Sequence, residues 1–107
     1  MHRTVEEMLQ KLAETNPKPD VIPIVRYKDE ETFKLFRNPE SGTLQQQTAV
    51  LEEALRELRL RGYRAIPVDI DIAEYRKWLG EDLNLTENRA LYISLKMREV
   101  RSKLKKS

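Results

Sequence analysis

Two aspartates in the stretch IPVDID, residues 66–71, are the side chains most suggestive of chemistry. Residues two apart share one face of an extended strand, and paired carboxylates bind Mg²⁺ or Ca²⁺. One hypothesis is therefore a small metal-dependent enzyme around Asp69 and Asp71, with Glu74 and Lys77 close by. The alternative is a half-buried strand in which Asp69 faces water and Asp71 caps the next helix. We favour this alternative and assign the chain no catalytic residue, metal site or cofactor.

The other side chains that commonly perform catalysis are scarce. The chain contains no cysteine, and its single histidine, His2, stands near one end, where chains usually fray. The serines consequently have no evident histidine partner to activate them. Gly42, Gly62 and Gly80 are the only glycines and are far apart, so there is no glycine-rich loop of the kind that binds phosphate. These features favour a protein that is not an enzyme.

A second candidate site is a helix-turn-helix-like segment at residues 79–98, in which residues 82–89 resemble the turn of helix-turn-helix proteins. If the preceding helix continued through Leu83, Gly80 would be the small contact residue and Asn84 would take the left-handed turn conformation. Arginine and asparagine, which follow that turn, are residue types that read base edges. The residues predicted to contact nucleic acid are Thr86, Asn88, Arg89, Tyr92, Lys96, Arg98 and Arg101.

The charge distribution supports this second hypothesis only in part. Residues 1–85 carry 13 basic and 16 acidic side chains, whereas residues 86–107 carry 7 and 2. A basic helix over 86–107 could meet phosphate or an acidic protein. It could equally be a solvated helix end whose cations complement the helix dipole. Glu81, Asp82 and Glu87 would also place negative charge beside a phosphate backbone.

A third candidate surface belongs to a helix expected at residues 44–61, whose apolar side chains extend over more than one face. An apolar stripe wider than a small sheet can cover often binds another chain. The residues predicted to form an oligomer contact are Val50, Leu51, Ala54, Leu58 and Leu60. The leading hypothesis is accordingly a small non-catalytic interaction protein that self-associates through helices. Its partner would be a second copy or another protein, and nucleic-acid binding is the alternative.

Capping residues and apolar spacing predict the elements that would position these residues. Branched residues predict two strands, at 21–27 and 64–70. Five helices are expected. The first covers about residues 5–15, with a capping box of Thr4 and Glu7, and the second runs for two turns from Asp29 up to Asn38–Pro39. Capping boxes also open the third and fourth helices, at 44–61 with Thr43 and Gln46 and at 71–79 with Asp71 and Glu74, and the last helix runs from Thr86 to beyond residue 100.

Together these elements predict one α/β domain over residues 1–107, with about five helices and a two-stranded sheet covered by helices on one face. Pro23 and Pro67 each require a free strand edge. The sequence leaves parallel and antiparallel pairing open, and the two Ile-Pro segments could reflect a duplication or two independent strands. With no cysteine and no apolar run long enough for a membrane, we expect a cytoplasmic protein without membrane contact.

Overall fold

A computed structural model describes residues 2–37 and 42–105. The elements follow in the order α1 (Arg3–Ala13), β1 (Ile22–Tyr27), α2 (Glu30–Phe36), α3 (Leu44–Leu60), β2 (Ala65–Ile70), α4 (Ile72–Leu79) and α5 (Thr86–Lys105). The predicted α/β architecture, with helices around a small two-stranded sheet, is confirmed. The helix end expected at Asn38–Pro39 and the loop expected at residues 40–41 lie outside the described residues.

Polar side chains at the helix starts explain where several helices begin. Asp29 accepts a hydrogen bond from a backbone N–H of α2 at 2.9 Å. Thr43 and Gln46 form the predicted capping box of α3, with reciprocal hydrogen bonds of 3.1 and 2.9 Å. Asp71 caps α4 by accepting a backbone hydrogen bond of 3.0 Å, although Glu74 does not complete a capping box there. Each cap satisfies an N–H group that the first helical turn leaves without a partner.

The start of α1 differs from the prediction: Thr4 and Glu7 do not form a capping box, and the prediction of one is wrong. The helix begins at Arg3, and the imidazole Nδ1 of His2 accepts a hydrogen bond of 3.1 Å from the backbone N–H of Thr4. Glu7 instead pairs with Arg3 at 3.1 Å. His2 therefore takes the place of the usual short polar residue at this cap.

The two strands pair in parallel, from Ile22 opposite Ala65 to Tyr27 opposite Ile70. The two helices α2 and α3 lie between the strands in the chain and provide the long connection that a parallel pair needs. Pro23 lies opposite Ile66 rather than Pro67, so the two Ile-Pro segments are offset by one residue.

Both outer edges of the sheet are protected against further strands. Ile22 donates to the carbonyl of Arg64, and the same alternation along a parallel ladder directs Pro23 and Pro67 toward the free edges. On the edge of β2, Arg59 donates hydrogen bonds of 3.0 and 3.3 Å to the carbonyl of Ala65. A proline within a six-residue strand makes each edge a poor template for pairing with another chain.

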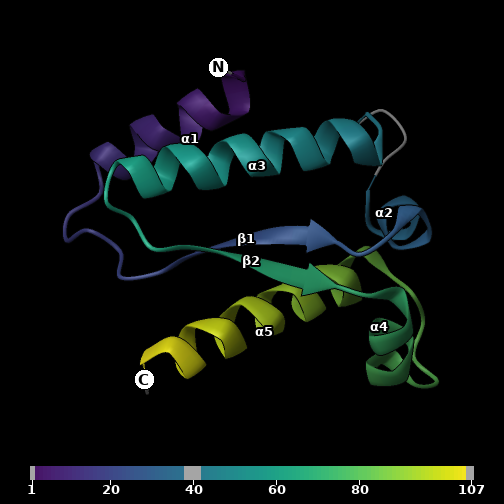
Figure 1. Cartoon of the computed structure of the whole chain (residues 1–107). Helices are drawn as coiled ribbons and strands as arrows, with labels where there is room; N and C mark the ends of the chain where they lie inside the picture. Colours follow the sequence, from purple (N-terminus) through teal and green to yellow (C-terminus); the bar gives the residue numbers. More distant parts are fainter. Residues whose placement is uncertain (1, 38–41, 106–107) are drawn as a thin grey trace.

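The expectation that helices cover only one face of the sheet is wrong. Helix α3, with α1 beside it, covers one face, and α5 covers the other (Figure 1). The stretch VIPIV, residues 21–25, is apolar at every position, which is typical of a strand buried on both faces. Near the carboxyl ends of the strands, α2 and α4 close the structure (Figure 1).

The core on the α5 side is built from aromatic rings and the apolar face of β2. Val68 and Ile70 pack with Tyr75 of α4 and Tyr92 of α5, whose ring centroids lie 5.2 Å apart. Phe36 of α2 reaches Tyr75 at 4.9 Å. Four elements therefore meet in one cluster, and their relative positions depend on it.

Candidate interaction surface

The side chain of Asp69, near the end of β2, is exposed, as predicted, while Val68 and Ile70 on either side of it are buried. Its carboxylate is bound by the guanidinium of Arg26, its register partner on β1, through Nε and through Nη2 at 3.1 Å. The hydrogen bond from Arg26 lowers the pKa of Asp69 and raises that of Arg26. The aspartate is thus held ionised by a protein cation.

The neighbouring carboxylates also have cationic partners. Asp71 combines its capping role with an ion pair to Lys28 at 3.3 Å, and Glu74 lies 3.8 Å from Lys96. Lys28, Asp71 and Glu74 border an open pocket of about 340 Å³ beside the strand ends. Among the described residues, no group of three His, Cys, Asp or Glu side chains is arranged to hold a metal ion. The arrangement is that of an ion-pair network between two strands and two helices.

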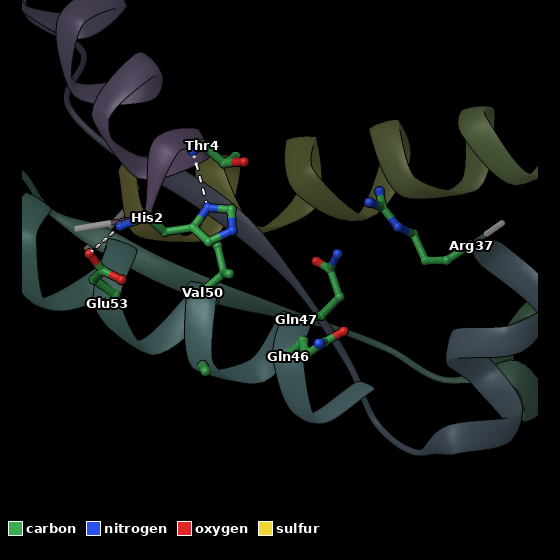
Figure 2. Close-up of a pocket in the computed structure, with 8 residues that line it drawn as sticks. His2, Thr4, Arg37, Gln46, Gln47, Val50 and Glu53 are labelled. Carbon is green, nitrogen blue, oxygen red and sulfur yellow. Dashed lines mark hydrogen bonds between the residues drawn. The ribbon is translucent and has the colours of Figure 1, made fainter. Parts of the chain in front are cut away.

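A pocket of about 640 Å³ lies between the starts of α1 and α3 (Figure 2). His2 and Thr4 line one side, and Gln47 and Glu53 of α3 line another. Arg37, at the end of α2, extends its guanidinium toward them (Figure 2). These are polar groups that could contact a solute.

Several of these polar groups already serve the helix ends. The backbone N–H of His2 donates to Glu53 at 2.9 Å, and its ring accepts from Thr4. The side-chain amide of Gln46 is bound to Thr43. His2, the residue type most suited to proton transfer, therefore uses its Nδ1 lone pair for capping, and the pocket carries no functional assignment.

Helix α4 ends at Leu79 and does not continue through Leu83, so the helix-turn-helix geometry predicted for residues 79–98 is wrong in this respect. Gly80 has φ 62° and ends the helix, and a Cβ atom added to it would meet no atom within 4 Å. It is therefore not a close contact between helices. Asn84 does not adopt the left-handed conformation, and Leu83 and Leu85 are exposed rather than packed around a turn.

Three residues predicted to contact nucleic acid instead hold the loop at residues 80–85. Arg89 donates hydrogen bonds of 3.0 Å to the backbone carbonyl and side chain of Asn84, and one of 3.1 Å to Thr86. Asn88 donates to the carbonyl of Leu83 at 2.6 Å. These polar groups satisfy the loop backbone, which fixes the loop on the first turns of α5.

The other predicted nucleic-acid contacts separate into buried and exposed residues. Tyr92 is only 4% exposed, so its prediction as a projecting side chain is wrong; its ring faces the aromatic core. Burial raises the pKa of Tyr92 to about 12, with smaller contributions from Glu74, Asp71 and Glu99. Lys96 is half-buried and lies between Glu74 and Glu99. Arg98 and Arg101 are exposed.

Three of the predicted oligomer contacts are wrong, because they face the interior. Leu51, Ala54 and Leu58 are buried where α3 covers the sheet. Val50 is half-buried at the pocket of Figure 2. Leu60 is 75% exposed and remains accessible. Most of the apolar residues of α3 that were predicted to contact a partner therefore pack against the sheet.

Exposed apolar side chains gather instead around the connection between α4 and α5. Five large apolar side chains of the described residues are exposed, and four of them fall within residues 78–91. Leu83 is 71% exposed and Leu85 is 51% exposed. The 78–91 surface, as we name it, consists of Trp78, Leu83, Leu85 and Leu91.

The loop that carries Leu83 and Leu85 is held by a hydrogen bond from the core. Tyr75 donates its hydroxyl hydrogen to the side chain of Asn84 at 2.7 Å. Asn84 therefore receives hydrogen bonds from both Tyr75 and Arg89, from two different helices. The sequence predicted that the polar side chains project and that Leu83 and Leu85 pack around a turn, whereas Asn88 and Arg89 bind the loop and the two leucines are exposed.

Comparison with protein-family models, with curated proteins and with solved structures finds no match. Within residues 2–37 and 42–105, no helix is both long and apolar enough to cross a membrane.

Proposed function

We propose that this chain is a small non-catalytic interaction protein that binds a protein partner through the 78–91 surface. The observation that carries the proposal is the concentration of exposed large apolar side chains in this one short segment. Grouped exposed apolar side chains on small domains commonly mark protein contacts. The absence of cysteine in the chain suits a reducing compartment, and we propose the cytoplasm.

The hydrogen bonds of the loop add a second argument. Asn84, Asn88 and Arg89 fix the backbone, so Leu83 and Leu85 are presented in one conformation. A loop that is already ordered loses less conformational entropy when it binds, and this favours recognition. A loop selected only to connect two helices would gain stability by turning such leucines inward.

Nucleic-acid binding remains the second candidate, now confined to the last turns of α5. Arg98 and Arg101 are exposed, and neither forms an ion pair with another described residue. Contacts of this kind would be made to phosphate rather than to base edges, so binding would weaken steeply with added salt. Duplex polarisation at low salt, with and without Arg101→Ala, measures this second candidate.

Site-specific photo-crosslinking tests the proposed function. A photoreactive amino acid replaces Leu83 in cells that express the chain, and the matched control carries it at Leu60, which is equally exposed but lies on α3. We expect a discrete crosslinked product from position 83 only. Leu85→Ser should reduce that product, because it removes neighbouring apolar area without touching the hydrogen-bonded backbone.

Equal crosslinking from positions 83 and 60, or none from position 83, would show that the 78–91 surface is not a contact site. Far-ultraviolet circular dichroism and unfolding midpoints establish that the variants remain folded. The mass of the product identifies the partner as a second copy or a different protein.

A further inference from the structure

We infer that the partner of the 78–91 surface is a second copy of the chain, bound through antiparallel packing of the two α5 helices. This inference rests on the proposed function and adds the identity of the partner. In the pair, the last turns of α5 of each copy would lie against the 78–91 surface of the other. Such a two-fold contact is isologous and is therefore made twice.

Opposite charges at the two ends of α5 are the first argument. Glu87 is exposed in the first turn of α5, Glu81 and Asp82 are exposed in the loop that precedes it, and Arg98 and Arg101 are exposed toward its end. None of these five residues forms an ion pair with another described residue. Antiparallel packing brings each acidic end beside a basic end, whereas parallel packing would place like charges together.

The outward stripe of α5 is the second argument. Residues at helical spacing along it are Glu87, Leu91, Leu95, Arg98 and Ser102, of which only Leu95 is half-buried. The opposite side of α5, with Ile93, Met97 and Val100, packs on the core. The stripe is therefore available to a partner, with two leucines near its centre.

The spacing of the stripe fits a two-fold axis near residues 94 and 95. That axis places Leu95 close to Leu95 of the second copy, and Glu87 level with residues 101 and 102 of the second copy. A two-fold axis keeps each side chain on the same flank of the pair. Glu87 of one copy and Arg101 of the other therefore meet at each end of the contact.

The size of the surface sets the expected strength. Helix α5 has 20 residues and is about 30 Å long, so one side of it offers about 300 Å² before the α4–α5 loop is added. Stable interfaces cover about 800 Å² on each partner. We therefore expect a weak, concentration-dependent dimer that loosens with added salt.

Charge reversal in separate copies tests the inference. Glu87→Lys and Arg101→Glu should each weaken the dimer roughly tenfold, because each places like charges together at both ends. An equimolar mixture of the two variants should associate again, since every contact in the mixed dimer pairs opposite charges. Sedimentation equilibrium between about 1 and 500 µM measures the mass relative to the 12.7 kDa of one chain.

The matched controls are Glu52→Lys and Arg56→Glu on α3, which lies on the other face of the sheet (Figure 1). Neither should change association, alone or mixed. A wild-type chain that stays monomeric throughout, a dimer that both α5 variants leave unchanged, or association that nuclease removes would each overturn the inference. A crosslink from position 83 to a different protein would overturn the dimer while leaving the proposed function in place.

Discussion

At Gly80 the backbone adopts φ 62° and ψ −125°, a conformation that residues with a Cβ atom rarely adopt. Lack of space is not the reason for glycine, because a Cβ atom here would meet no atom within 4 Å. The conformation ends α4 after Leu79 and directs the chain into the loop that exposes Leu83. The conformation of Gly80 is therefore what distinguishes this structure from one in which α4 continues through Leu83.

Gly80→Ala distinguishes the two conformations, because they predict effects of opposite sign. In a continuous helix, alanine would raise the free energy of unfolding by about 1 kcal/mol relative to glycine. At a positive φ it should lower the free energy of unfolding by about 1–3 kcal/mol. Urea denaturation measures the difference, with Glu81→Ala as a neighbouring control of little expected effect. A stabilised Gly80→Ala protein would contradict the end of α4 at Leu79.

At the scale of elements, one buried hydroxyl joins the starts of α2 and α4. Thr32 Oγ1 donates to Asp29 at 2.7 Å and accepts the backbone N–H of Ile72 at 3.1 Å. The hydrogen bonds from Thr32 hold the pKa of Asp29 below its usual range. Because Thr32 is fully buried, water does not replace these contacts if the hydroxyl is lost.

Thr32→Val keeps the shape of the side chain but leaves the N–H of Ile72 without its acceptor. We expect the free energy of unfolding to fall by about 1–3 kcal/mol, the usual cost of an unsatisfied buried donor. Thr32→Ser retains the hydroxyl and should recover most of the loss. Urea midpoints at constant slope measure both variants. A valine variant as stable as the wild type would show that this hydrogen bond between α2 and α4 does not stabilise the fold.

The pairing of the two strands could be predicted from the sequence only in part. Arg26 and Lys28, at the end of β1 and just after it, have the same spacing as Asp69 and Asp71, at the end of β2 and just after it, and the structure pairs them in that order. The complementary spacing was readable, but it fits an antiparallel pairing equally well. The covering of both faces was also readable from the unbroken apolar stretch at residues 21–25.

At the scale of the whole molecule, Tyr92 ties α5 to the aromatic cluster. Its ring lies 5.2 Å from that of Tyr75 and 5.4 Å from that of Trp78. Burial and the nearby carboxylates raise its pKa to about 12 from the ordinary value of 10.0. The folded chain therefore keeps this phenol neutral at a pH where the unfolded chain ionises it.

The sign of the resulting pH dependence follows from linkage. The stabilising contribution of neutral Tyr92 is fully present below about pH 10 and is lost as the pH rises toward about 12. We expect wild-type protein to lose on the order of 2 kcal/mol more stability over this range than Tyr92→Phe, which retains the ring. Urea denaturation at several alkaline pH values measures both proteins. Parallel losses in the two proteins would contradict the buried, neutral state of Tyr92.

The sequence by itself determined the local features of this protein. Caps at Asp29, Thr43 and Asp71 and the start of the last helix at Thr86 depend on contacts between residues a few positions apart. Such contacts can be deduced from residue type and spacing, because the hydrogen bonds of a helical turn and its cap join residues close together in the chain. The positions of both strands follow from their runs of branched residues. The backbone of a strand, by contrast, bonds to another strand, and that pairing joins residues about 43 positions apart here.

Only the tertiary structure decided which side of each helix faces inward. The sequence predicted Tyr92 and Leu58 as contact residues, but both are buried. Leu83 and Leu85, which were predicted to pack around a turn, are exposed. The choice depends on burying apolar area against surfaces far away in the chain, and helical spacing alone does not identify those surfaces. Most other large apolar side chains of the described residues are buried or half-buried between the sheet and its helices, whereas those of the 78–91 surface are exposed.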